Sequence, residues 1–158
     1  MFYAALKAVH LLAIVAWVGG LFFVFTCLRP ALRGLDGPVR LRLASEVLGR
    51  FLTIVNMAVA LVLGSGLAML WLAVGEARGP GLAFNMPLDW YAMIGLGLVM
   101  MAIFGHLRGV LFKRLDRAVK AGDWAAGALA FEPIQGWVAV NLVLGVIVIV
   151  AMRLGAAA

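Results

Sequence analysis

Residues 8–28, AVHLLAIVAWVGGLFFVFTCL, decide the fold class of this chain. The stretch contains one imidazole and no Asp, Glu, Lys or Arg. A helix of this length rises about 30 Å, which is the thickness of the hydrocarbon core of a bilayer. The apolar run is too long for a signal peptide and lacks a small-residue cleavage site. We therefore expect it to remain in the membrane.

The rest of the chain has the same character. Of its 158 residues, 66% are apolar and only 13% are charged, whereas soluble domains contain about 45–50% and about 25%. This composition excludes a soluble enzyme and a nucleic-acid binder, even though the formal net charge is +6. The lone Cys27 excludes an internal disulfide and a cysteine-based zinc site. The chain has the composition of an integral membrane protein.

The pattern of apolar runs predicts an all-α, polytopic membrane protein folded as one domain over residues 1–158. Four segments are long enough to span, at about 3–28, 51–74, 90–112 and 136–153. Pro38 suits the first turn of a helix, and Asp123 suits an N-cap. We therefore expect a four-transmembrane-helix bundle with short amphipathic interfacial helices in the two cytoplasmic connections.

Basic residues predict the orientation. Ten of the thirteen lie on one side: Arg29, Arg33, Arg40, Arg42, Arg50, Arg108, Lys113, Arg114, Arg117 and Lys120. Lys7, Arg78 and Arg153 lie on the other side. The positive-inside rule then places both termini in the periplasm of a bacterial inner membrane and the two basic connections in the cytoplasm. The charge also meets lipid headgroups, so the bilayer itself is the first partner.

Polar side chains within spans are costly and often mark functional sites. Lys7, His10 and Trp17 are spaced to share one face of the first span, and Ser65 in the second span reaches a similar depth. They predict an outer polar layer. His10 is either a metal or haem ligand or a packed histidine that donates to a backbone carbonyl. Lys7 either extends to the headgroups or supplies a fixed cation within the membrane.

A second, inner layer is expected from Asn56, His106 and Asn141. Helix counting separates His106 from His10 by roughly 12–15 Å along the membrane normal, too far for one shared metal ion. The two histidines therefore suit two sites or two stations on one path. His106 also lies near the interface and could extend toward it. Asn56 and Asn141 either support a ligand or join helices through hydrogen bonds.

The sequence lacks the phosphate-binding, dinucleotide-binding, nucleophile-elbow and H-E-x-x-H signatures of soluble enzymes. The carboxylates lie in connections or at span ends, so no acidic proton relay is visible. Thioethers select copper(I), but no Met-x-x-x-Met pair repeats along one face. An enzyme is thus less expected than a binding or transport protein.

Three stretches resemble the copper resistance D (CopD) membrane family. They are KAVHLLAIVAWVGGLFFVFTCLRPAL (7–32), LGLVMMAIFGHLRGVLFKRLDRAVKAGDW (96–124) and VNLVLGVIVIV (140–150). The resemblance implies copper handling at the bacterial inner membrane, and carries a metal-binding role to His10 and His106. Larger members have more spans and often work beside a periplasmic copper-binding protein. A chain with only four spans therefore also suggests a homo-oligomer.

The same spacing of His10, Trp17 and Gly19-Gly20 also resembles the four-helix, haem-b-containing membrane protoporphyrinogen oxidase. That resemblance implies His10 as an axial ligand and Lys7, Trp17 or Arg78 beside the haem. Four-helix bundles with small residues are suitable hosts for a haem. If the chain is an enzyme, it is then a haem-dependent membrane oxidoreductase.

Three functions follow, in this order of preference. The first is a protein that binds or conducts copper ions through intramembrane histidines. The second is a haem-b redox protein or enzyme. The third is a non-catalytic accessory subunit in which both histidines pack as hydrogen-bonding residues. The direction and driving force of transport are not encoded in any motif of the sequence.

Overall fold

The computed structural model describes residues 1–76, 86 and 88–155, and every regular element in that part of the chain is helical. The elements join into four long rods. These are α1 (Phe2–Phe23) with η1 (Val24–Leu28) and α2 (Arg29–Arg33); α3 (Gly37–Glu76); α4 (Leu88–His106) with η2 (Leu107–Leu111) and α5 (Phe112–Ala121); and α6 (Trp124–Gly155).

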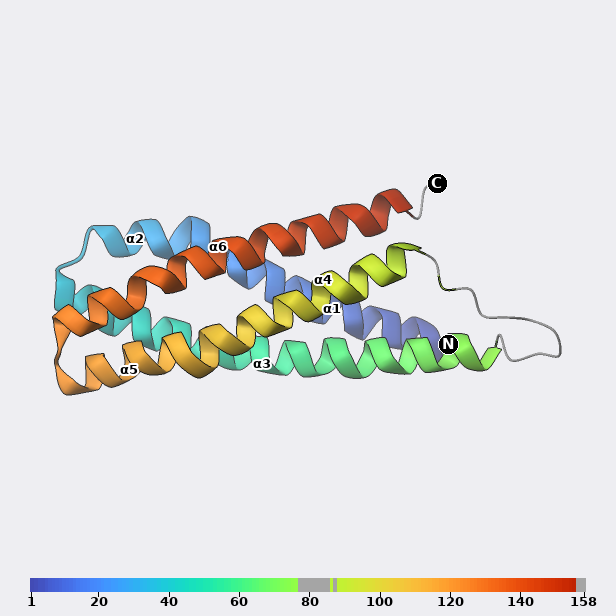
Figure 1. Ribbon diagram of the computed structural model, residues 1–158, viewed down its shortest axis with the longest axis horizontal. Helices are drawn as coiled ribbons and strands as arrows, with labels where there is room; N and C mark the ends of the chain where they lie inside the picture. The colour runs from blue at the N-terminus through green and yellow to red at the C-terminus, as the bar shows by residue number, and fades with distance from the viewer. Residues whose placement is uncertain (77–85, 87, 156–158) are drawn as a thin grey trace.

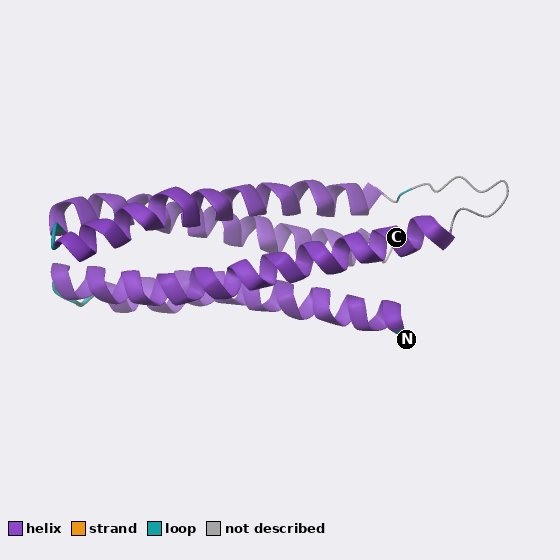
Figure 2. Cartoon of the chain, turned by 90° about the horizontal axis from the view of Figure 1, so that it is seen from below, coloured by secondary structure: helices purple, strands orange, loops and turns teal. Residues whose placement is uncertain are grey.

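The four rods run up and down side by side, and both termini lie at one end of the bundle (Figures 1 and 2). We call this the terminal end. At the opposite end, residues 34–36 join α2 to α3 and residues 122–123 join α5 to α6. We call this the basic end because the ten arginines and lysines of the two connecting segments gather toward it. Such short connections make neighbouring helices antiparallel.

Among the described residues, four helices are long and apolar enough to cross a membrane: Phe2–Arg33, Gly37–Gly75, Leu88–Ala121 and Trp124–Met152. Large apolar side chains such as Leu12, Val15 and Phe22 lie exposed on the outer surface of the bundle. A helix that is apolar on all sides is stable only where lipid or protein surrounds it. The protein is therefore a multi-pass membrane protein, as the sequence predicts.

The structure does not show the short interfacial helices that we expected. The residues concerned extend the spanning helices instead, so that α3 begins about 20 Å before the predicted span at residue 51. The reason is a continuous stripe of buried residues at helical spacing along α3: Leu41, Ala44, Leu48, Leu52 and Val55. Because the face that packs in the membrane continues beyond it, no break separates the two parts.

Asp123 does act as an N-cap, but it caps the long helix α6. Its Oδ1 accepts the backbone N–H of Ala126 at 2.9 Å, which satisfies one of the free donors at a helix start. The preceding Gly122 ends α5 in the left-handed conformation, with φ of 70°, where glycine carries no steric penalty. Pro38 lies in the first turn of α3, as expected.

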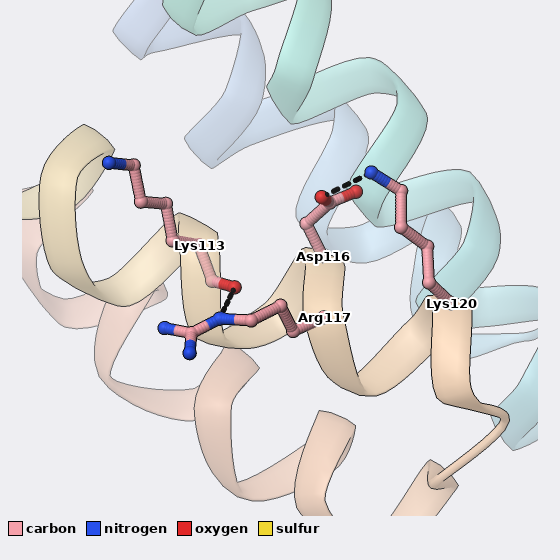
Figure 3. Close-up of polar contacts among 4 residues, drawn as sticks. All are labelled: Lys113, Asp116, Arg117 and Lys120. Carbon is pink, nitrogen blue, oxygen red and sulfur yellow. Dashed lines mark hydrogen bonds and ion pairs between the residues drawn. The ribbon is translucent and has the colours of Figure 1, made fainter.

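Helix α5 is amphipathic and continues α4 beyond η2. Its Leu115 is fully buried, whereas Lys113, Asp116, Arg117 and Lys120 form the polar face shown in Figure 3. Lys120 Nζ and Asp116 Oδ2 form an ion pair at 2.6 Å. An exposed pair of this spacing stabilises a helix by only about 0.3–0.5 kcal/mol. Burial of the apolar face, rather than the ion pair, holds α5 against the bundle.

One π-helical turn interrupts the first rod and another the third. In η1 the N–H of Arg29 bonds to the carbonyl of Val24, and Pro30, which follows at once, has no N–H to continue the ladder. The wider turn thus accommodates the proline without ending the rod. In η2, directly after His106, the N–H of Phe112 bonds to the carbonyl of Leu107. Single π-turns within helices are frequent at functional sites.

Glycines bring the rods into close contact at two levels. A Cβ at Gly20 would overlap the ring of Phe51, so the absence of a side chain at Gly20 lets this ring of α3 pack against α1. A Cβ at Gly145 would lie 2.9 Å from Cγ2 of Val18 and 3.2 Å from Cε of Met100. Small residues permit this approach in membrane bundles. The contacts also fix the register between α1, α4 and α6.

Candidate functional site

The inner face of α1 carries the residues singled out in the first span. His10, Ala13, Trp17, Leu21 and Val24 follow one another at intervals of three or four residues, and all are buried. Lys7 lies one turn before His10 but is exposed. Of the three residues expected to share a face, His10 and Trp17 therefore lie inside the bundle, whereas Lys7 lies outside it.

His10 is held by α3. Its Nδ1 lies 2.9 Å from Oγ of Ser65, and the Ser65 hydroxyl donates its proton to the carbonyl of Leu61 one turn earlier. Because a serine has only one hydroxyl proton, the Ser65 oxygen accepts the proton of Nδ1. This arrangement favours the Nδ1–H tautomer of neutral His10, in which Nε2 carries the lone pair. Of the outer polar layer expected from Lys7, His10 and Ser65, the structure brings His10 and Ser65 into contact and leaves Lys7 exposed.

Gly66 on α3 lies directly beside the His10 ring. A Cβ at this position would lie 3.4 Å from Cε1 and 3.8 Å from Nδ1 of His10. The imidazole therefore packs directly against the backbone of α3. The sequence shows Gly64 and Gly66 as small residues of the second span, but it gives no sign that only Gly66 touches the histidine.

Deeper in the bundle, two buried polar side chains have no hydrogen-bond partner among the described residues. They are Trp17, through Nε1, and Asn141, through both Oδ1 and Nδ2. Asn141 has an exposed fraction of 0% and lies one turn from Gly145, which contacts Val18 and Met100. The Trp17 ring meets Phe104 edge-on, with centroids 6.2 Å apart. Both residues thus lie at one level in the middle of the bundle.

The other two members of the expected inner layer lie on the outer surface. Asn56 and His106 are exposed, and the His106 ring contacts the edge of Trp137 with centroids 5.9 Å apart. The structure therefore does not bring Asn56, His106 and Asn141 together in the interior. Helix counting gives the depth of a residue well, but the face that it occupies depends on how the rods rotate against each other. Whether His106 binds a metal stays a prediction.

Within the described residues, no group of three or more His, Cys, Asp or Glu side chains lies close enough to hold a metal ion. His10 is therefore not part of a cluster of three such side chains in this part of the chain. Met69 lies one turn from Ser65 on the same face of α3 and is half-buried. The register set by Val18, Gly145 and Met100 brings the half-buried Met93 and Met152 to about the depth of His10. These three thioethers come from three helices, so spacing along a single span does not group them.

The family comparison agrees with this architecture of apolar helices and sparse polar groups. Residues 45–154 match the family of copper resistance protein D, CopD. This chain belongs to the CopD family. No curated protein and no solved structure is significantly similar to it. The matched range covers most of α3, all of α4 and α5 and nearly all of α6, so it includes Ser65, His106 and Asn141. It begins after α1.

Membership links this membrane protein to copper resistance. The CopD resemblance noted in the sequence is thereby confirmed, together with the expected membrane location and helical fold. His10 and Trp17 lie in the part of the chain outside the matched range. Their role therefore depends on their own geometry.

Proposed function

We propose that this CopD-family protein binds copper(I) within the membrane at His10 and hands it on along the inner faces of α1 and α6. The single observation that supports the proposal most directly is the His10–Ser65 hydrogen bond. Metal-binding histidines usually donate their second ring N–H to a neighbouring acceptor, which fixes the tautomer and orients the ring. His10 has this arrangement with Nε2 left for a metal ion.

The neighbouring chemistry favours copper(I) over a harder ion. Imidazole and thioether groups suit copper(I), whereas carboxylates and waters suit magnesium or calcium. Met69 shares the face of α3 that carries Ser65, and Met93 and Met152 reach a similar depth. Among the described carboxylates, Asp89 at the start of α4 lies about one turn from Met93, and the others lie further from this level. A singly charged ion is also easier to transfer into this apolar interior than a doubly charged one.

Trp17 and Asn141 support a route further into the bundle. Their unpaired indole and amide groups lie in an otherwise apolar stripe, where a hydrated ion or an ordered water can use them as partners. His106 lies on the outer surface and faces away from this stripe. It can join a path only where a second copy of the chain covers that surface, which gives the proposed homo-oligomer a role.

The orientation proposed from the basic residues places His10 nearer the periplasm, with both termini on that side of a bacterial inner membrane. Copper would then reach His10 from a periplasmic copper-binding protein, and the basic end would face the cytoplasm. This direction suits uptake.

Haem b is the alternative group that His10 could bind. The same Nε2 could serve as an axial ligand, but Lys7 is exposed and Arg78 lies outside the described residues. Neither of the two pockets at the basic end, which are lined by residues 24–48 and 128–138, includes His10. The described residues therefore favour copper over haem.

The experiment that tests the proposal combines a reduced-minus-oxidised absorption spectrum of the detergent-purified protein with quantification of copper and iron in the same sample. We expect a featureless visible spectrum and copper that is retained by the wild type and by His106→Ala but lost in His10→Ala. A Soret band with stoichiometric iron would establish the haem function instead. If His10→Ala retains copper at the wild-type level, copper binds at other residues and the proposed role of His10 is overturned. If the wild type retains neither copper nor iron, the accessory-subunit function is favoured.

A further inference from the structure

A basic pocket lies at the basic end of the bundle, away from His10. It has a volume of about 280 Å³ and lies between α2, the start of α3 and the first turns of α6. Figure 1 shows these three segments close together at that end. Arg29, Arg33 and Arg40 line the pocket, together with Gln135 and Glu132 from α6. Two arginines of one rod and one of the next thus converge on one space.

The arginines of this pocket lack counter-ions. None of the three forms an ion pair with a carboxylate of the described residues, Glu132 included. The Nε atoms of Arg29 and Arg40 are buried and have no hydrogen-bond partner within the described part of the chain. Arg29 is oriented by the Phe25 ring, which lies 5.4 Å from its Cζ. Buried charged donors without partners are costly, so a bound anion would stabilise the site.

A second, apolar pocket adjoins the first on the membrane side. The two share Arg29, Leu32, Phe131 and Gln135, and the second continues past Val24, Leu28 and Val138. These apolar residues belong to the predicted spans, whereas Arg33 and Arg40 lie beyond them. This second pocket measures only about 20 Å³, which is room for a water molecule and not for an acyl chain. A ligand held by the arginines therefore carries its negative charge outside the hydrocarbon and its apolar part along the outer surface of the spanning helices. A phospholipid has this distribution.

We propose that Arg29, Arg33 and Arg40 bind the phosphate group of an acidic phospholipid whose acyl chains lie in the surrounding bilayer. The planar guanidinium group donates to phosphate through paired N–H groups. Basic pockets between transmembrane helices are suitable sites for anionic headgroups. The carboxylate of Glu132 at the pocket edge repels a second negative charge, which favours a singly charged headgroup such as that of phosphatidylglycerol.

The test uses the full chain, delipidated in detergent, with native mass spectrometry to count bound lipid and thermal unfolding to measure its effect. Phosphatidylglycerol, phosphatidylcholine and inorganic phosphate are added separately. We expect saturable binding of phosphatidylglycerol with a raised melting temperature, and no such effect of the other two probes. The triple variant Arg29→Gln/Arg33→Gln/Arg40→Gln should weaken phosphatidylglycerol binding by tenfold or more, since each lost charged contact is worth about tenfold.

The matched control is Arg50→Gln/Lys113→Gln/Arg114→Gln, which removes the same charge from exposed positions near the same end and should bind phosphatidylglycerol as the wild type does. Equal weakening in both triple variants would overturn the proposal in favour of general electrostatic attraction. Equal binding of phosphatidylcholine would also overturn it, and an effect of inorganic phosphate alone would reassign the pocket to free anions. If the triple variant fails to fold, the exposed Arg33→Gln alone must still weaken binding.

Discussion

His10 on α1 and Ser65 on α3 join the first two rods by a hydrogen bond of 2.9 Å from Nδ1 to Oγ. The Ser65 hydroxyl is committed to the carbonyl of Leu61, so the serine acts as the acceptor. The bond therefore does more than hold two helices together, because it also sets which ring nitrogen of His10 is available to a ligand.

Ser65→Ala tests that relationship. Without the acceptor, the His10 ring is free to change tautomer and orientation, and we expect copper(I) affinity to fall by about 10–100-fold while the fold persists. Competition with a copper(I) chelator measures the affinity. The matched control is Ser45→Ala, a buried serine on the same helix that does not contact His10. Equal losses in both variants would mean that the hydrogen bond has no role in binding.

The contact between Gly20 and Phe51 predicts a stability difference between neighbouring glycines. A Cβ at Gly20 would overlap the Phe51 ring, whereas a Cβ at Gly19 meets nothing within 4 Å. Gly20→Ala should therefore destabilise the protein by about 1–3 kcal/mol. Gly19→Ala should leave it unchanged or stabilise it by up to about 1 kcal/mol, because alanine favours helix. Thermal unfolding in detergent compares the two, and a loss at Gly19 as large as that at Gly20 would contradict the packing of α1 on α3.

The sequence predicts the number of spans and the depths of His10 and Ser65 well, because both depend on properties that lie along one helix. Four apolar runs give four rods, and the depths of His10 and Ser65 follow from helical rise. Depth alone also placed Asn56 and His106 in the interior with Asn141. The structure leaves them exposed, because rotation of each rod is set by contacts between helices, such as Gly145 with Val18.

The positions at which the helices begin and end are also only partly predictable from the sequence. Pro38 and Asp123 start helices as expected, yet these helices are α3 and α6 themselves rather than short interfacial segments. The apolar length of a span sets where the membrane ends, but it does not set where the helix ends. The buried stripe that continues through Leu41 and Leu48 decides the latter, and it can be recognised only when the packed face is known.

Asn141→Leu tests whether the buried amide of Asn141 serves copper transfer rather than stability. Asn141 is fully buried, and neither of its amide atoms has a hydrogen-bond partner among the residues that the structure describes. Its replacement by an apolar residue of similar size should leave the free energy of unfolding unchanged or raise it by up to about 1–3 kcal/mol. The melting temperature should then stay the same or rise. Copper uptake by cells should nevertheless fall if the amide serves the proposed route. Asn56→Leu, on the exposed surface, should alter neither quantity. A large loss of stability in Asn141→Leu would mean that the amide has an undetected structural partner.

Met69→Leu tests the preference for copper(I). The substitution keeps an apolar side chain of similar volume, so packing on α3 should change by less than about 1.5 kcal/mol. It removes a soft thioether from the face that carries Ser65, and we expect copper(I) affinity to fall about tenfold with copper(II) affinity unchanged. Titration against chelators specific for each oxidation state measures both. Met57→Leu is the matched control, because Met57 is 57% exposed on the outer surface of the same helix. Equal loss of copper(I) binding in the two variants, or loss of copper(II) binding in Met69→Leu, would place the thioether of Met69 outside the site and leave His10 to bind copper with other partners.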